Sequence, residues 1–195
     1  MSNTPGRKEL THDRILDVAA RAIRRAGYDG VGVADIMKEA GLTHGGFYAH
    51  FASRNALLAE AMQRAGRDSE AVLAARMRQG QAEGLSTFSA LVHTYLGEGE
   101  LGNAEQGCAV AALASEMPRQ SPEVASAARA RVLALVDLVR RSLPAGVNPA
   151  HAQVVTSTMI GTLQLARTLG GKAGKAWLAN ARDTLINQYI AGRAG

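Results

Sequence analysis

Long apolar runs are missing from this sequence of 195 residues, and cysteine occurs only once, at Cys108. A transmembrane helix needs about 18 or more consecutive apolar residues, so none is expected. One cysteine cannot form an internal disulfide, and the five histidines are too scattered to complete a zinc site with it. The first residues are polar and lack the apolar core of a signal peptide. We therefore expect a cytoplasmic protein that contacts no membrane and holds no metal.

The sequence patterns that accompany common catalytic sites are also missing. There is no glycine-rich phosphate loop, no Gly-x-Ser-x-Gly nucleophile motif and no paired-carboxylate motif. The sequence thus predicts no catalytic residues and no cofactor, and it disfavours an enzyme. A purely structural helical adaptor remains an alternative, although such a protein would not need the residue pattern between positions 42 and 54.

No segment alternates between apolar and polar residues for long enough to predict a strand. Apolar residues instead recur with the helical period along most of the chain, so we expect an all-α protein of about nine helices. Their approximate ranges are 11–26, 33–40, 43–51, 53–80, 85–96, 108–117, 121–143, 148–169 and 172–191. Residues 1–10 are expected to form a polar tail, which is either solvated or placed against a phosphate backbone through Arg7 and Lys8.

The chain carries a net charge of +5 at pH 7. A basic balance favours polyanionic partners such as nucleic acid, but it does not determine the fold. Residues 1–25 contain six Lys/Arg and three acidic residues, while the region that follows is nearly neutral. Charge alone is therefore weak support for DNA binding.

Residues 33–51 have the pattern of a helix-turn-helix, in which a second short helix enters the major groove of DNA. One face of the first helix is apolar at positions i, i+3, i+4 and i+7, which are Val33, Ile36, Met37 and Ala40. Gly41 can adopt the left-handed conformation that ends a helix, and Thr43 can cap the next helix through its hydroxyl. Phe47 and Phe51 would share the buried face of that second helix. The outward face would then consist of Thr43, His44, Gly46 and His50.

Residues 11–66 resemble the DNA-binding end of TetR-family transcriptional regulators. The segments that carry the resemblance are Arg14–Ala19, Gly27–Tyr28, Val33–Ile36, Ala40–Thr43, Phe47–Arg54 and Ala56–Leu58. The combination of Tyr-x-His-Phe with a following basic residue and a Leu-Leu pair is far more specific than a generic helix-turn-helix. It implies an all-α homodimer with a three-helix DNA-binding domain, residues 1–52, and an effector-binding and dimerisation domain, residues 53–195. A weaker similarity over Gly107–Glu116 and Ala166–Arg167 points to a multidrug-type subgroup.

The resemblance also implies roles for individual residues. Base edges of double-stranded operator DNA would be contacted by the start of the second helix: Thr43, His44, Gly45 and Gly46. The DNA backbone would be contacted by Tyr48, His50 and Arg54. Arg54 stands where the family most often has lysine, and Gly32 stands where it commonly has a Ser or Thr cap. Because no Arg or Lys precedes Arg54 in the recognition helix, bidentate reading of guanine is not available there.

The candidates for binding a small effector in the C-terminal part are His93, Tyr95, Cys108, Glu116 and Met117. Each has a structural alternative. His93 and Tyr95 would otherwise take part in packing, and Cys108 is a ligand contact, a redox-sensing thiol or a buried apolar cysteine. Glu116 would meet a cationic ligand or cap a neighbouring helix.

The last two predicted helices, Pro149–Leu169 and Lys172–Ala191, carry apolar or small residues around much of their circumference. Such helices must be buried on more than one side. They lie either in the core of the domain or against a second subunit, and we favour the subunit contact because a groove reader gains specificity from two half-sites. Together with the resemblance, this predicts a homodimeric repressor that a small, largely apolar effector releases from its operator.

Overall fold

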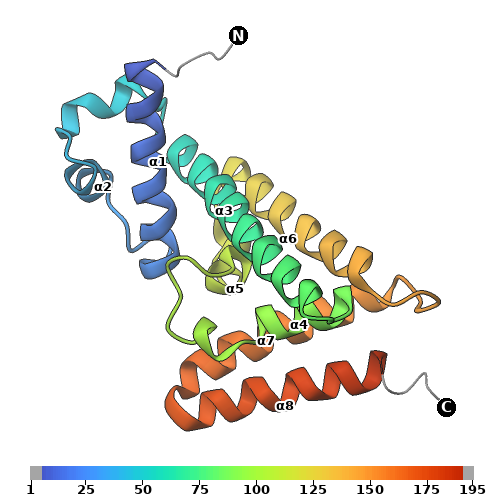
Figure 1. Cartoon of the computed structure of the whole chain (residues 1–195). Helices are drawn as coiled ribbons and strands as arrows, with labels where there is room; N and C mark the ends of the chain where they lie inside the picture. The colour runs from blue at the N-terminus through green and yellow to red at the C-terminus, as the bar shows by residue number, and fades with distance from the viewer. Residues whose placement is uncertain (1–5, 191–195) are drawn as a thin grey trace.

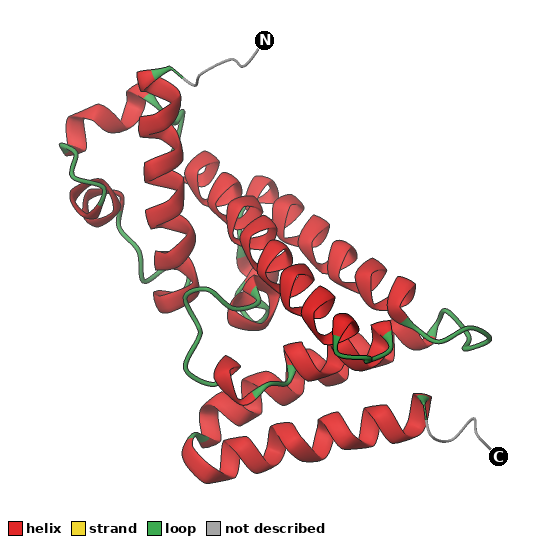
Figure 2. Ribbon diagram, viewed as in Figure 1, coloured by secondary structure: helices red, strands yellow, loops and turns green. Residues whose placement is uncertain are grey.

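The computed structural model describes residues 6–190 and contains, over that range, helices and turns but no strand (Figure 2). Its α-helices are α1 (Arg7–Ala26), α2 (Val33–Glu39), α3 (Arg54–Ala82), α4 (Thr87–Tyr95), α5 (Ala109–Leu113), α6 (Pro122–Ser142), α7 (His151–Leu169) and α8 (Gly171–Tyr189). Three short 3-10 helices are η1 (His44–Ala49), η2 (Glu98–Glu100) and η3 (Met117–Arg119). The predicted all-α class is confirmed. Ala191, the predicted end of the last helix, lies outside the described residues.

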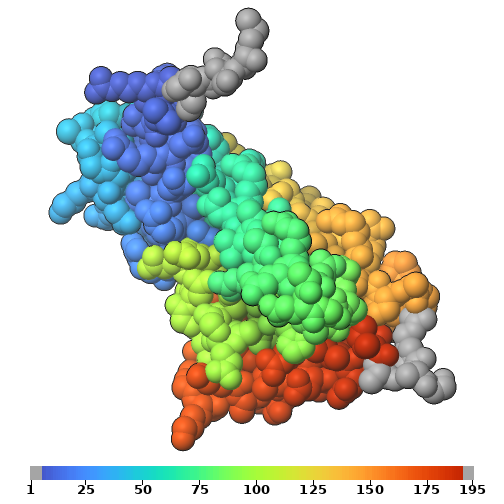
Figure 3. Space-filling model, in the orientation of Figure 1, coloured from blue at the N-terminus to red at the C-terminus, as the bar shows by residue number. Residues whose placement is uncertain are grey.

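The molecule is elongated, with α1, α2 and η1 at one end and the α7–α8 hairpin at the other (Figure 1). The long helix α3 joins the two ends and packs against α1, α4 and α6. The space-filling view shows the blue N-terminal helices well separated from the orange and red helices α7 and α8 (Figure 3). Coupling between the two ends therefore has to pass through the segments that lie between them.

Helix α1 begins at Arg7, four residues before the predicted start at Thr11. The Glu9 carboxylate accepts a hydrogen bond from the backbone N–H of Gly6 at 2.8 Å, which satisfies a donor at the helix start. Thr11 lies inside the helix, where its hydroxyl donates to the Arg7 carbonyl. The prediction of a polar tail was therefore wrong for residues 7–10, and residues 1–5 lie outside the described range.

Two further boundaries differ from the prediction. The helix expected over 108–117 is shorter, because α5 covers only Ala109–Leu113 and is followed by turns and η3. Helix α7 begins at His151, because the Asn148 side chain accepts from the Ala150 N–H and shapes a turn before the helix. A polar side chain can cap a turn as well as a helix, and its sequence signature is similar in both cases.

The start of α3 and the end of α2 agree with the prediction. The Ser53 hydroxyl accepts from the Ala56 N–H at 3.0 Å and caps α3. Gly41 follows α2 with a φ of +70°, a conformation that glycine adopts without strain. Among residues 6–190, no helix is both long and apolar enough to cross a membrane.

Candidate nucleic-acid interface

The short helix η1 is held against the N-terminal core by two phenylalanines. Phe47 and Phe51 are each 2% exposed, and their rings stack at a centroid distance of 5.7 Å. Ile36 and Met37 of α2 are buried in the same core cluster. The predicted inward face of the helix-turn-helix is confirmed.

The local form of η1 differs from the expected α-helix. Its hydrogen bonds join residues three apart, from the Gly46 N–H to the Thr43 carbonyl and from the His50 N–H to the Phe47 carbonyl. Thr43 occupies the N-cap position in an extended conformation, but its hydroxyl accepts no capping hydrogen bond. The hydroxyl predicted to cap the helix is therefore left for other partners.

The outward face of η1 is small, polar and accessible. Thr43, His44 and Gly45 are exposed, Gly46 is half-buried, and the Tyr48 side chain is 74% exposed. The Tyr48 ring meets the edge of Phe47 at 5.1 Å, which orients it although most of its surface faces solvent. An exposed tyrosine fixed at its base has its hydroxyl directed away from the core and available for a hydrogen bond.

His50 lies beside a hollow formed with residues of α1. The hollow is lined by Lys8, Glu9, His12, Asp13 and His50. Burial of the ring, together with nearby His12 and Lys8, lowers the pKa of His50. The Nδ1 atom of His50 is buried without a hydrogen-bond partner among the described residues.

The part of α1 beside His50 was missed in the sequence interpretation. His12 stacks on Phe51 at 4.5 Å, and its Nε2 atom lies 2.9 Å from the Glu60 carboxylate of α3. Lys8 and His12 are one helical turn apart and therefore share a face. That spacing was visible in the sequence, but the expected start of the helix at Thr11 removed Lys8 from it.

Arg54 stands at the start of α3 and holds the turn between α1 and α2. Its Nη2 group donates to the carbonyl oxygens of Tyr28, at 2.5 Å, and Val31, at 3.3 Å. A guanidinium has five N–H donors, so Arg54 keeps donors that are not used in these two hydrogen bonds. Arg54 thus has an internal role that its position in the recognition pattern did not predict.

The same turn is held from the other side by Glu116. The backbone N–H of Tyr28 donates to the Glu116 carboxylate at 2.8 Å. Gly27 precedes it with a φ of +76°, and a Cβ atom at Gly27 would collide with the Glu116 carboxylate. The structure therefore places the Glu116 carboxylate against the turn that follows α1. Met117, which follows it, is buried.

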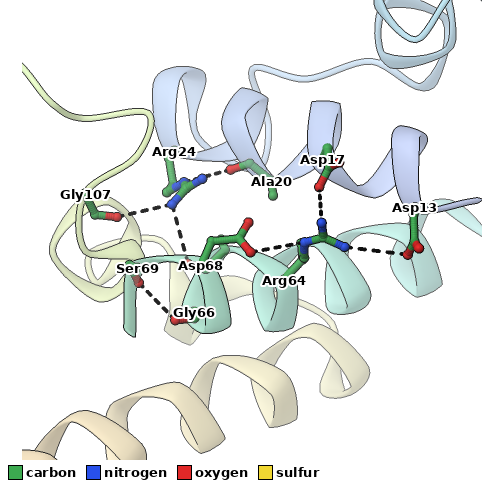
Figure 4. A network of polar contacts seen from close by, with 10 residues as sticks. Asp13, Asp17, Ala20, Arg24, Arg64, Gly66, Asp68, Ser69 and Gly107 are labelled. Atoms are coloured by element: carbon green, nitrogen blue, oxygen red, sulfur yellow. Dashed lines mark hydrogen bonds and ion pairs between the residues drawn. The ribbon is translucent and has the colours of Figure 1, made fainter. Parts of the chain in front are cut away.

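Arg24 links α1 to the C-terminal part of the protein (Figure 4). Its side chain is buried, and its Nε group donates to the Ala20 carbonyl of α1. Its Nη1 group donates to the carbonyls of Ala65 in α3, at 3.4 Å, and Gly107, at 3.3 Å. Burial lowers the pKa of Arg24, although an arginine remains charged at neutral pH. The cation thus joins three segments at one point.

Arg64 forms a second link between α1 and α3 in the same view (Figure 4). Its guanidinium lies 2.5 Å from the Asp17 carboxylate, 3.6 Å from Asp13 and 3.1 Å from Asp68. The groups are partly exposed, so each pair contributes little alone. As a network they fix how α1 rests on α3.

A cavity lies in the C-terminal part, between α3, α4, α7 and the segment of residues 97–108, which we call the cavity loop. Tyr95 and Cys108 line it together with Arg76, Glu100 and Leu163. His93 faces a separate surface groove, and neither Glu116 nor Met117 lines the cavity. The structure therefore brings two of the five effector candidates together. Glu100, which is buried in this glycine-rich loop, was missed in the sequence interpretation.

The surroundings of Cys108 disfavour the thiolate form. Burial raises the pKa of Cys108, so the protonated form, which is a poor nucleophile, is favoured. Among residues 6–190, no group of three or more His, Cys, Asp or Glu side chains is arranged to hold a metal ion.

Residues 15–61 match the sequence model of a family described as bacterial regulatory proteins, tetR family. Residues 15–61 are a TetR-family DNA-binding segment. A curated relative, the uncharacterised HTH-type transcriptional regulator YvdT of Bacillus subtilis strain 168, is 40% identical over 47 residues, which is 24% of each chain. The chain thus matches only about a quarter of that relative's length, and this similarity concerns the DNA-binding end.

Solved TetR-family structures are similar over nearly the whole chain. A transcriptional regulator from Agrobacterium tumefaciens has a TM-score of 0.74 at 22% identity, covering 93% of this chain and 98% of the other. A second, from Chloroflexus aurantiacus J-10-FL, has a TM-score of 0.72 at 22% identity, covering 94% and 96%. At such identities the likeness shows the fold alone, so the TetR-family architecture extends beyond the matched residues without assigning a ligand.

Proposed function

We propose that the protein is a homodimeric transcriptional repressor that binds operator DNA through η1. The observation that carries the proposal is the accessible face of η1, built from small and hydrogen-bonding residues on a helix that two buried phenylalanines hold in place. We place the boundary between the DNA-binding and effector domains at residues 52 and 53, where the chain leaves η1 for α3. Such a protein would act in the cytoplasm, where its DNA is.

On this proposal the residues of η1 divide into two groups. Base edges are met by Thr43, His44, Gly45 and Gly46, with the Thr43 methyl suited to thymine. Phosphates are met by Tyr48, His50 and Arg54. The close approach of a glycine backbone, bridging water and DNA shape then supply the specificity that arginine would otherwise provide.

The proposed subunit contact uses the outer faces of α7 and α8. These helices bury Leu163 and Leu178 inside the subunit, yet large apolar side chains remain exposed on their outer faces. The exposed ones are Val154 (62%), Leu165 (54%), Leu169 (52%) and Trp177 (46%). Exposed apolar side chains gathered on one hairpin favour association, and a second copy supplies a matching surface by two-fold symmetry.

Effector release is proposed to act through the cavity loop. Three arginines from different helices hold this loop, since Arg24 bonds Gly107, Arg76 pairs with Glu100, and Arg167 donates to the carbonyls of Glu100 and Asn103. A ligand that moves the loop would change the hydrogen bond between Arg24 and Gly107 and so the position of α1 relative to α3. It can do so only to the extent that it binds the two arrangements with different affinity.

Selection of bound duplexes from a random DNA pool tests the proposal. We expect an inverted repeat whose half-site centres lie about 10 base pairs, or roughly 34 Å, apart, because two η1 helices of a dimer would enter successive major grooves. Enrichment of no common sequence, with binding governed by salt alone, would contradict it.

A further inference from the structure

The placement of α2 and η1 depends on how the chain leaves α1. Helix α2 packs against α1 and η1. The chain enters this pair through residues 27–32, after α1 ends at Ala26, and leaves it through residues 50–53, before α3 begins at Arg54. The direction of the turn at residues 27–32 therefore helps to decide where η1 stands relative to the rest of the protein.

The end of α1 is not closed by its own backbone alone. The Gly27 N–H donates to the Ile23 carbonyl at 2.8 Å, which is the last hydrogen bond of the helix. Where glycine ends a helix in the usual way, the next N–H also bonds a carbonyl of the last turn. Here the Tyr28 N–H donates instead to the Glu116 carboxylate at 2.8 Å. The turn thus depends on a side chain that lies 88 positions further along the chain.

The Glu116 carboxylate rests directly on the backbone of Gly27. A Cβ atom at position 27 would collide with the Glu116 side chain, and Gly27 has a φ of +76°, so glycine is required there for two reasons. The Tyr28 ring is 0% exposed, so the residue whose N–H is held is also anchored in the core of the N-terminal helices. A shift of the Glu116 carboxylate would consequently disturb both the turn and part of that core.

Glu116 itself is held firmly by the C-terminal part of the protein. Its N–H donates to the Leu113 carbonyl of α5 at 2.9 Å, and its carbonyl accepts from the Arg119 N–H of η3 at 3.0 Å. Leu113 and Met117, on either side of it, are buried, and α5 packs against α1, α3, α6 and α7. The carboxylate is therefore a fixed point of the proposed effector domain that touches the DNA-binding end.

From these contacts we propose that Glu116 is a positioning residue for DNA recognition, and this inference rests on the proposed function. Its carboxylate oxygen fixes the Tyr28 N–H, and so the direction of the turn that carries α2 and η1 to the operator. The negative end of the α1 dipole does not attract a carboxylate, so the role requires the oxygen acceptor and not the charge. Base reading needs exact placement and general attraction to phosphates does not, so Glu116 affects the first and not the second.

Fluorescence anisotropy with full-length Glu116→Gln and Glu116→Met tests the inference on two duplexes. One is a duplex that the native protein enriches from a random pool, and the other has the same composition in scrambled order. Both replacements keep the length of the side chain, but only glutamine keeps an oxygen acceptor for the Tyr28 N–H. Glu116→Met should bind the enriched duplex about tenfold more weakly and the scrambled duplex as the native protein does. Glu116→Gln should stay within about twofold of the native protein on both.

Glu123→Met is the matched control, because Glu123 is exposed in the first turn of α6. This variant should leave both affinities unchanged, and circular dichroism should show that each variant is folded at the temperature of the titration. A contact that only stabilises the fold would lower the midpoint of thermal unfolding without changing the ratio of the two affinities below that midpoint. The ratio of the affinities therefore separates positioning from stability.

Hydrogen exchange of the native protein tests the same contact without any variant. The Tyr28 amide should exchange slowly in the free protein and at least as slowly with the enriched duplex bound, because the Glu116 contact belongs to the DNA-bound arrangement. Faster exchange of this amide in the complex would overturn the inference. So would native affinity of Glu116→Met for the enriched duplex, or equal losses for Glu116→Met and Glu116→Gln. Failure of the native protein to enrich any duplex would instead remove the proposed function, and the inference with it.

Discussion

Arg54 shows how one side chain serves both the fold and the proposed interface. Its guanidinium fixes the Tyr28 and Val31 carbonyls, while the Glu116 carboxylate accepts from the Tyr28 N–H on the other side. The turn between α1 and α2 is therefore held by two residues of the proposed effector domain, Arg54 and Glu116. Arg54 therefore positions the turn next to η1, and on the proposed function it also contacts a phosphate.

Replacing Arg54 by alanine should have two separable effects. The loss of two hydrogen bonds from a charged donor should lower the free energy of unfolding by about 1–3 kcal/mol. The loss of a phosphate contact should lower the salt slope of DNA binding by about one unit. Denaturant unfolding and fluorescence anisotropy at several salt concentrations measure the two.

Arg54→Lys separates these effects, because it keeps the charge but lacks the planar fork. Its salt slope should match that of the native protein while its stability falls. An unchanged slope for Arg54→Ala would remove this residue from the DNA interface.

His50 should make DNA affinity depend on pH. In the free protein its pKa is lowered by burial and by His12 and Lys8, and a bound phosphate would counteract these effects and raise it. Binding would then take up a proton, so affinity should rise as the pH falls through the pKa of the bound state, and level off below that of the free state. Anisotropy titrations between pH 5.5 and 8, at about constant ionic strength, measure this dependence.

The charged groups around His50 are those that line the hollow, Lys8, Glu9, His12 and Asp13 of α1, with Glu60 of α3 bound to His12. His50→Gln should flatten the dependence while His12 and its partners remain in place. The same pH profile in the native protein and this variant would show that another group takes up the proton.

For single residues, the sequence alone predicted burial correctly where the role of the residue depends on its near neighbours in the chain. Phe47 was expected inside, because its position on one short helix decides this, and the expectation is confirmed. The role of Glu116 was left open, because its partner Tyr28 is 88 positions away in the chain. No local pattern identifies such a partner.

At the scale of elements, η1 is unusual in carrying two glycines near its start. A Cβ atom added at Gly45 would meet nothing within 4 Å, so the folded protein does not require glycine there. Close approach of the backbone to DNA would require it. The free protein therefore tolerates a side chain at this position, whereas the proposed DNA complex would not.

Gly45→Ala should consequently leave the thermal stability unchanged or slightly higher, and weaken specific DNA binding by about 1–3 kcal/mol, comparable to a mismatched base pair. Gly99→Ala is the matched control, since a Cβ there also meets nothing within 4 Å and the site is remote from η1. Equal affinity of Gly45→Ala and the native protein would mean that the backbone does not approach the DNA closely.

The boundaries of the elements were predictable where a single strong signal stood alone. Ser53 before α3 and Gly41 after α2 are such signals. The start of α1 was missed, because its first turn is polar and shows no apolar periodicity. The hydrogen bond from the Gly6 N–H to Glu9 that stabilises this turn has no apolar signature in the sequence. The 3-10 form of η1 was missed as well, since buried residues four apart fit both helix types over so short a length.

At the scale of the whole molecule, the proposed interfaces lie at opposite ends (Figure 1). The all-α class and the order of helices followed from periodicity, and the TetR-family likeness of the DNA-binding end followed from the residues around η1. The cavity did not follow, because it is assembled from four segments whose packing no local pattern records. The contacts of Arg24, Arg76 and Arg167 with the cavity loop could not be predicted for the same reason.

The subunit contact can be tested with a charge on α8. Trp177→Glu should yield a monomer in sedimentation at micromolar concentration, because a buried unpaired charge at an apolar interface is costly. Specific DNA binding should fall with it, since a monomer reaches only one half-site. Leu133→Glu on α6 is the matched control, because Leu133 is 62% exposed yet lies outside the α7–α8 hairpin.

A dimer in both variants would move the subunit contact away from Trp177, and a monomeric native protein would exclude the dimer altogether. Circular dichroism of both variants separates loss of association from loss of folding.

Footprinting on the DNA upstream of the protein's own gene tests the central claim most directly. We expect two protected half-sites about one helical turn apart, seen with the native protein and lost with Gly45→Ala at the same concentration. Absence of protection at low salt, or protection that spreads evenly over any sequence, would contradict the proposal that η1 reads an operator.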